Sequence, residues 1–143
     1  MSQDAEALRK SNILLATKVL EDFGRNMDGW YDNLHENVIM EFPYGPSIGM
    51  PDRAEGKAAC SGVFQFADQF LRVKFYDIRI QGLADPNKLI VECKGHGTPD
   101  AGDYHQQYVF LQEYRDGKLF STKEYFNTKL VIDLLGDLSP LFS

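Results

Sequence analysis

The chain has 143 residues, the usual size of one domain, and its 43% of hydrophobic residues is enough for a folded core. A net charge of −6 without any Lys/Arg cluster argues against nucleic acid as a partner. No apolar run approaches the roughly 20 residues that a membrane helix needs, and the polar, acidic residues 1–6 are unlike a signal peptide. We therefore expect a single cytoplasmic domain over residues 1–143 that has no membrane as a partner.

The two cysteines, Cys60 and Cys93, each lie in an apolar stretch and match no metal-binding spacing. Cysteines in such surroundings behave as small buried hydrophobic residues. We expect two free thiols, as is usual in a reducing compartment.

Apolar residues recur at helical spacing in the first half of the chain. They predict helices over residues 4–23, 27–35 and 56–70. A short strand over 38–42 is closed by Pro43, and the segment 44–55, rich in proline and glycine, predicts an ordered loop.

Beyond residue 70 the apolar residues alternate with polar ones, which is typical of strands. Four strands are predicted, over residues 73–82, 88–97, 104–114 and 119–127. Asp116-Gly117 is a strong signal for a tight hairpin, and a last helix is expected over 128–135. Helices grouped on one face of an antiparallel meander give an α+β fold.

The hairpin allows the side chains of two strands to be assigned to faces. A two-residue turn pairs Arg115 with Lys118 and therefore Val109 with Glu124. One face then carries His105, Gln107, Val109, Leu111, Glu113, Phe120, Thr122, Glu124 and Phe126, and the other carries Tyr104, Gln106, Tyr108, Phe110, Gln112, Leu119, Ser121, Lys123 and Tyr125. Because both faces hold large apolar residues, we expect one to meet the helices. The other would form a homodimer through Tyr108, Phe110 and Tyr125.

Glu124 is the candidate catalytic residue, because apolar surroundings raise the pKa of a carboxyl group toward the range of a general acid or base. The alternative is that Glu124 points outward and pairs with Lys123 or a surface arginine. His105 is a second catalytic candidate, with a structural role as its alternative. The expected pocket for a hydrophobic small molecule is lined by Trp30, Phe42, Phe64, Gln107, Leu111, Phe120, Thr122 and Phe126.

No metal site and no cofactor are expected. The three histidines, His35, His96 and His105, include no pair one helical turn apart, the spacing that is typical of a zinc-binding helix.

Several motifs resemble the SnoaL-like, ketosteroid-isomerase-like branch of the NTF2-like superfamily. They are Val-Ile-Met-Glu-Phe-Pro-Tyr-Gly over 38–45, Glu-Gly-Lys over 55–57, Arg-Asp-Gly-Lys-Leu over 115–119 and Lys-Glu-Tyr-Phe-Asn over 123–127. Within that branch, Asp-Pro-Asn over 85–87 and Val-Glu-Cys-Lys-Gly over 91–95 are most similar to the phenazine-biosynthesis A/B proteins.

The resemblance implies a cone in which three N-terminal helices pack on a curved, mainly antiparallel sheet and a short helix ends the domain. It also implies that Glu124 is the proton-transfer group. The histidine that phenazine A/B proteins carry early in the third helix falls near Gly62, and the working positions of ketosteroid isomerase fall at Lys18, Phe42 and Val109. The resemblance therefore indicates the fold more closely than the reaction.

Two functions follow from these expectations. The first is an enzyme that performs cofactor-free proton transfer, as isomerisation, dehydration or cyclisation, on a hydrophobic cyclic metabolite, with His105, Gln107 or Thr122 orienting the substrate. The second is a non-catalytic module that uses the same pocket for binding, or the sheet for dimerisation.

Overall fold

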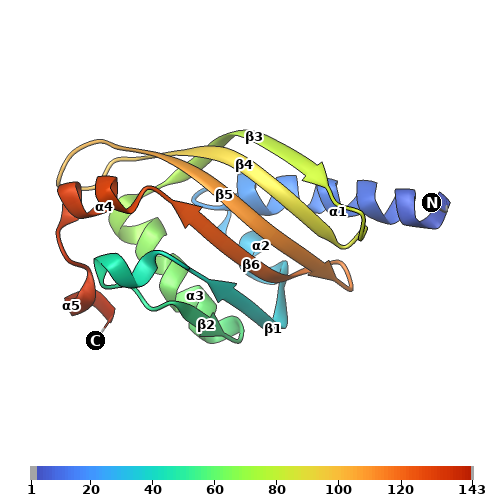
Figure 1. Ribbon diagram of the computed structural model, residues 1–143, viewed down its shortest axis with the longest axis horizontal. Helices are drawn as coiled ribbons and strands as arrows, with labels where there is room; N and C mark the ends of the chain where they lie inside the picture. Colours follow the sequence, from blue (N-terminus) through green and yellow to red (C-terminus); the bar gives the residue numbers. More distant parts are fainter. Residues whose placement is uncertain (1–2, 143) are drawn as a thin grey trace.

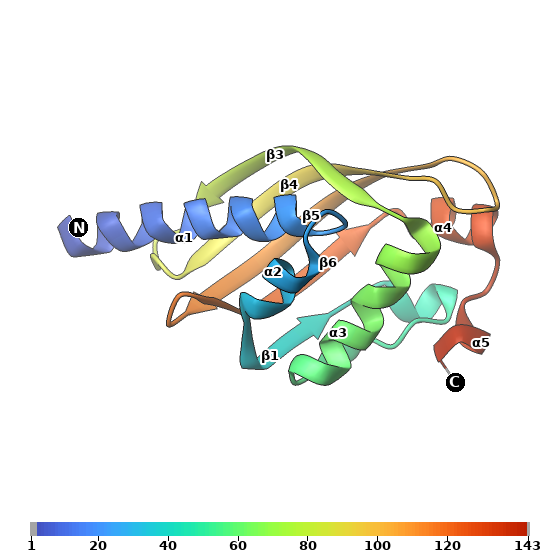
Figure 2. The ribbon, with the colours of Figure 1, turned by 180° about the vertical axis from the view of Figure 1, so that it is seen from behind.

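The computed structural model describes residues 3–142, which form a curved six-stranded sheet with helices on one side (Figures 1 and 2). The helices are α1 (Gln3–Asp22), α2 (Met27–Asp32), α3 (Lys57–Phe66), α4 (Thr128–Leu135) and α5 (Ser139–Phe142). The strands are β1 (Leu34–Glu41), β2 (Arg53–Glu55), β3 (Lys74–Gly82), β4 (Lys88–Gly97), β5 (Tyr104–Arg115) and β6 (Lys118–Phe126).

The strands are arranged in the order β2-β1-β6-β5-β4-β3. All neighbouring pairs are antiparallel except β1 and β6, which run parallel. Figure 2 shows α1, α2 and α3 in front of the sheet, and Figure 1 shows the opposite face without a helix across it. The predicted α+β cone with a mainly antiparallel sheet is confirmed.

Aromatic residues from the helices fill the concave side of the sheet. Phe23, at the end of α1, is fully buried, and its ring lies 5.4 Å from the ring of Trp30 and 5.6 Å from that of Phe64. Phe75 of β3 approaches the same ring at 5.4 Å. Removing a buried aromatic side chain typically costs about 3–5 kcal/mol, so this cluster fixes the helices to the sheet.

Residues 33–37 and 53–55 differ from the expected structure. The second helix ends at Asp32, and β1 already begins at Leu34, which is fully buried and pairs with Leu119 of β6. Residues 53–55, expected in a loop, form β2 against β1. Both strands form through pairing with segments distant in sequence, which local patterns do not report.

The third helix has two parts. Regular α-helix ends at Phe66, and a π-helical turn over Ala67–Leu71 continues the segment to Arg72, which has a positive φ of 53°. Phe70, which lies on this wider turn, is exposed.

The hairpin between β5 and β6 has the predicted two-residue turn, in which Asp116 and Gly117 have φ of 53° and 70°. Arg115 pairs with Lys118 and Tyr114 with Leu119, as expected. The register then shifts, so that Glu113 pairs with Ser121 and Phe120 is an additional residue on β6. Beyond this β-bulge, Glu124 lies opposite Phe110 and not Val109.

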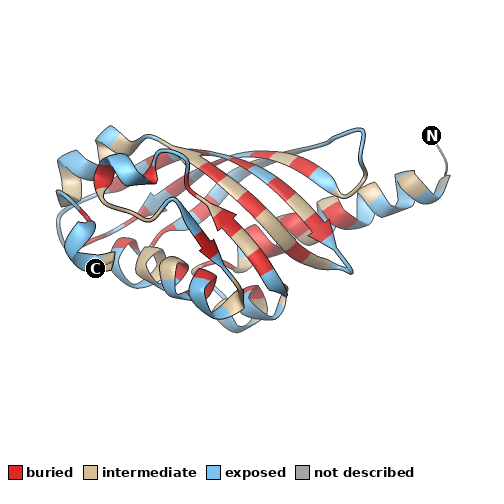
Figure 3. Ribbon diagram, turned by 60° about the horizontal axis from the view of Figure 1, so that its bottom comes forward, coloured by how far each residue is buried: buried red, intermediate tan, exposed pale blue. Residues whose placement is uncertain are grey.

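The bulge reverses the expected faces of β5, because a shift of one residue turns a whole set of side chains to the other side. Figure 3 shows buried and exposed positions alternating along the strands. Tyr108 and Phe110 are 6% and 2% exposed and pack edge-to-face on Phe75 beneath the helices. The predicted dimer interface through Tyr108 and Phe110 is therefore wrong, and only Tyr125 lies on the outer face.

The cysteines follow the sequence prediction. Cys60 and Cys93 are buried free thiols, and burial raises their pKa values to about 11 and about 12. Among residues 3–142, no helix has the length and apolarity needed to cross a bilayer.

Candidate active site

A small apolar cavity lies inside the cone, between the inner face of the sheet and the third helix. Its volume is about 40 Å³, room for about two or three water molecules. It is lined by Phe42, Met50, Val63, Phe64, Phe66, Ala67, Leu71, Val73, Phe75, Tyr104, Tyr108, Glu124, Phe126, Val131 and Leu138. Glu124 is the one carboxylate on this otherwise apolar and aromatic wall. A ring-sized ligand fits only if the wall moves outward.

Glu124 reaches the cavity from the middle of β6 and is 7% exposed. Among residues 3–142 no ion pair or hydrogen bond joins its carboxyl group to another residue, and no charged neighbour shifts its ionisation. Burial raises its pKa from 4.5 to about 8, because an ionised carboxylate loses its hydration there. The alternative of an outward glutamate paired with Lys123 or a surface arginine is wrong, because the side chain is buried and forms no ion pair within residues 3–142.

Two tyrosines of β5 share the cavity wall with Glu124. The hydroxyl oxygens of Tyr104 and Tyr108 lie 2.8 Å apart, and the Gln106 amide Nε2 donates to the Tyr104 hydroxyl at 3.2 Å. The bond between the two hydroxyl groups can run in either direction. When Tyr104 donates to Tyr108, the Tyr108 proton is free for a ligand in the cavity. Burial raises the pKa of Tyr104 to about 12 and that of Tyr108 well above its ordinary value, so both phenols keep their protons at neutral pH.

Gln106 also holds the two strands together at this end of the site. Its Nε2 donates to the Asn127 carbonyl oxygen at 3.0 Å, and its Oε1 accepts from the Asn127 backbone N–H at 3.0 Å. A buried side-chain amide satisfied on both sides is rigid. The position of the tyrosine pair relative to β6 is therefore fixed.

Five of the expected pocket residues lie on the inner side. Phe42, Phe64 and Phe126 line the cavity with Glu124. Trp30 and Thr122 border a second void, of about 20 Å³, on the other side of Phe64.

The other three expected pocket residues and the second catalytic candidate, His105, lie outside the cone. His105, Gln107 and Leu111 are exposed on the outer face of β5, because the bulge moves them away from Glu124. Phe120, the additional residue of the bulge, packs at the hairpin under Arg115. Their predicted positions in the pocket are wrong.

Sequence reasoning missed Tyr104 and Tyr108, which the assumed register placed on the dimer face. One signal could have identified them. The row of β5 with His105, Gln107, Glu113 and Arg115 is polar enough to face solvent, and that alone places the tyrosine row inside.

No family model matches the chain. The uncharacterised protein YesE of Bacillus subtilis is 33% identical over 115 residues, which is 78% of each chain. An uncharacterised PhzA/B-like protein of Pseudomonas aeruginosa is 31% identical over 110 residues, 76% of this chain and 77% of its own. The chain belongs to the PhzA/B-like family of proteins. Its fold is that of an NTF2-like protein of Burkholderia pseudomallei, which aligns with a TM-score of 0.74 over 87% of this chain and 97% of its own at 16% identity.

Solved structures share the fold of this PhzA/B-like chain. The phenazine biosynthesis-related protein PhzB2 of P. aeruginosa aligns with a TM-score of 0.81 and 23% identity, over 93% of this chain and 90% of its own. A candidate isomerase from B. subtilis aligns with a TM-score of 0.79 and 28% identity, over 90% of this chain and 94% of its own. The SnoaL-like fold expected from the sequence motifs is confirmed.

Proposed function

We propose that this PhzA/B-like protein binds a hydrophobic cyclic metabolite in the Glu124 cavity and catalyses cofactor-free proton transfer, as isomerisation, dehydration or cyclisation. One observation carries the proposal: Glu124 is the only buried carboxylate among residues 3–142, and it has no counter-charge. A buried, uncompensated acid is costly to keep unless it is used. The description of the Bacillus structural neighbour as a candidate isomerase supports the same reaction class.

The proposed chemistry divides between Glu124 and the tyrosine pair. Because the pKa of Glu124 is about 8, both protonation states are accessible near neutral pH. The carboxylate accepts a proton from a carbon next to a carbonyl group, and the protonated acid returns it to another carbon. Meanwhile Tyr108, supported by Tyr104, donates to the carbonyl oxygen where negative charge develops.

The apolar wall completes the proposed site. Aromatic rings of Phe42, Phe64 and Phe126 provide flat contact surfaces for a ring system and exclude water from the carboxyl group. Phe66 and Ala67 lie where α3 changes to the π-helical turn, and Leu138 precedes α5. We propose that these two segments move outward to admit the ligand.

The proposal is tested with β-tetralone, a cyclic ketone whose α-protons are weakly acidic. In deuterated buffer, the wild-type protein is expected to accelerate deuterium incorporation, followed by proton NMR, with saturation as ketone concentration rises. The Ala67→Leu variant, whose three additional carbon atoms occupy the cavity, is expected to lose this saturable exchange while keeping its circular dichroism spectrum. Saturable binding of fluorescent β-naphthol by a protein that gives no exchange above buffer would instead favour the non-catalytic binding module.

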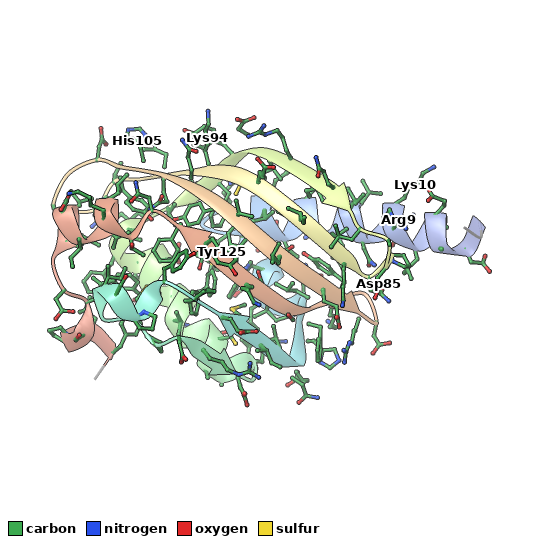
Figure 4. The ribbon with its side chains drawn as sticks, viewed as in Figure 1. Arg9, Lys10, Asp85, Lys94, His105 and Tyr125 are labelled. Carbon is green, nitrogen blue, oxygen red and sulfur yellow. The ribbon has the colours of Figure 1, made fainter. Side chains whose placement is uncertain are left out.

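We further propose that the protein forms a homodimer through the outer face of the sheet. Val109 and Leu111 are 38% and 37% exposed there, and Tyr125 lies on the same face, in contact with Tyr44 at 5.6 Å between rings (Figure 4). Apolar side chains in a row on a sheet suit a symmetric contact with a second copy.

Leu111→Lys is expected to convert this dimer to a monomer in sedimentation at micromolar concentration, because it places a charge in the contact. Leu14→Lys on α1, where the leucine is 72% exposed, is the control and should leave the dimer intact. A wild-type protein that sediments as a monomer at this concentration would contradict the proposal.

A further inference from the structure

His96 and His105 lie side by side on the outer face of the sheet. They are direct cross-strand partners on β4 and β5, and their rings stack with centroids 4.5 Å apart and planes inclined by 14°. Asp103 immediately precedes β5. Its Oδ1 lies 3.5 Å from His96 Nε2 and its Oδ2 lies 3.9 Å from His105 Nε2. Two imidazoles and one carboxylate thus converge on one point, near the end of the face where Figure 4 labels His105.

The spacing is close to that of a metal centre. One ligand atom from each of the three residues lies within 4.8 Å of the other two. In a tetrahedral zinc site, bonds of about 2.0–2.1 Å place the ligand atoms roughly 3.4 Å from one another. All three side chains are exposed, so small rotations about their side-chain bonds bring them to that distance without moving the backbone.

The loop that carries Asp103 is held in place from its other end. Arg72 Nη1 donates to the Thr98 carbonyl oxygen at 2.5 Å, and Arg72 Nη2 pairs with Asp100 at 2.9 Å. Arg72 is thereby engaged by Asp100 and does not neutralise Asp103. Lys94, the next residue of β4 on the outer face, pairs with Asp77 on β3 at 3.6 Å. The Asp103 carboxylate therefore faces the two imidazoles without a competing ion pair to Arg72 or Lys94.

We propose that His96, Asp103 and His105 bind one divalent transition-metal ion of the zinc type, with its remaining coordination position open to water. Imidazole nitrogen and carboxylate oxygen together suit such ions, whereas Mg²⁺ and Ca²⁺ prefer all-oxygen sites. The net charge of −6 favours cation binding in general. The site is separate from the Glu124 cavity, which lies on the other side of the sheet.

Metal binding would connect the end of β4 to the start of β5. Tyr104 lies between the ligands Asp103 and His105 and points inward to the cavity, where its hydroxyl contacts that of Tyr108. A metal ion outside the sheet would therefore restrict the backbone that positions this phenol. This effect is independent of whether the cavity is catalytic.

Isothermal titration with Zn²⁺ tests the site, using tag-free protein first treated with a chelator. The wild type is expected to bind one ion per chain, and His96→Ala, His105→Ala and Asp103→Asn are each expected to weaken binding by about tenfold or more. His35→Ala is the matched control: His35 Nε2 faces Asp116 at 3.9 Å without a second histidine, so this variant should bind as the wild type does.

Two further measurements make the result decisive. Added Zn²⁺ should raise the unfolding temperature of the wild type and of His35→Ala, but not of the His96→Ala/His105→Ala double variant, since only ligands of the folded state stabilise it. Imidazole NMR signals of His96 and His105 should shift, and those of His35 should not. Equal Zn²⁺ binding by the wild type and the double variant would overturn the proposal, as would the absence of stoichiometric binding by the wild type.

Discussion

Glu124→Gln is expected to reduce the rate of β-tetralone deuteration by about 100-fold or more, the usual contribution of a general acid or base. Glutamine has the same shape but cannot exchange a proton, and it adds no charge to the cavity. Fold and β-naphthol binding should therefore remain. Because Glu124 has no partner among residues 3–142, the substitution breaks no ion pair that could confuse the result.

Glu92→Gln is the matched control for this measurement. Glu92 lies on the outer face of β4, with its carboxyl 3.8 Å from Arg79, and its substitution should leave the exchange rate within about twofold, as is usual for surface changes. Full exchange activity in Glu124→Gln would assign the proton transfer to another group and contradict the role of Glu124.

The second large effect is on stability as a function of pH. The pKa of Glu124 rises from an ordinary 4.5 to about 8 in the folded protein, so the folded chain holds this proton more tightly than the unfolded chain does. Below the lower pKa both states are protonated and the burial of Glu124 adds no ionisation cost. As pH rises from 4.5 to about 8, the free-energy cost of burying the ionised carboxyl group grows. The cost is complete above the pKa of the folded state. The wild type should lose up to ~5 kcal/mol of unfolding free energy through this one group.

Urea unfolding of the wild type and Glu124→Gln at about pH 5 and about pH 9 measures this linkage. The variant is expected to gain stability relative to the wild type at the higher pH, because its amide has no ionisation to suppress. Glu92→Gln should follow the wild type at both values. Parallel pH profiles for the wild type and Glu124→Gln would mean that the carboxyl titrates as it does in the unfolded chain.

The two measurements separate burial from function. A glutamate that raises stability at low pH but transfers no proton to a ketone is a buried structural acid. A glutamate that does both has the combination of accessibility and altered pKa expected of a general base. The cavity of about 40 Å³ makes the opening of the wall a requirement for the second outcome.

Local sequence patterns were sufficient for most secondary structure. The strand Lys88–Gly97 and the helix Thr128–Leu135 have the predicted bounds. The apolar residues of the strand alternate with polar ones, and those of the helix recur at helical spacing, so both patterns can be recognised within the segments. The turn at Asp116-Gly117 also follows from local chemistry, since both residues tolerate the positive φ that the hairpin requires. The burial of Glu124 was expected as well, although from a pairing that was off by one residue.

Side-chain placement across the sheet was decided by tertiary structure. The additional residue Phe120 is held outside by Arg115, whose guanidinium lies 3.7 Å from the ring centroid, and by the edge of His35 at 5.2 Å. These contacts accompany the register shift of β6, and no local pattern in the hairpin sequence predicts them. The shift keeps Glu124 inside but exchanges His105, Gln107 and Leu111 for Tyr104, Gln106 and Tyr108 as its companions on β5.

By itself the sequence determined most of the elements, the tight turn and the α+β class, because these depend on the preferences of neighbouring residues. Only the tertiary structure decided which side chains meet. It joined β1 to β6 in parallel and brought His96 to His105 and Asp103, although the sequence offered no metal spacing. The physical reason is that strand side chains alternate with period two, so the face of every residue depends on a register set by contacts between distant segments.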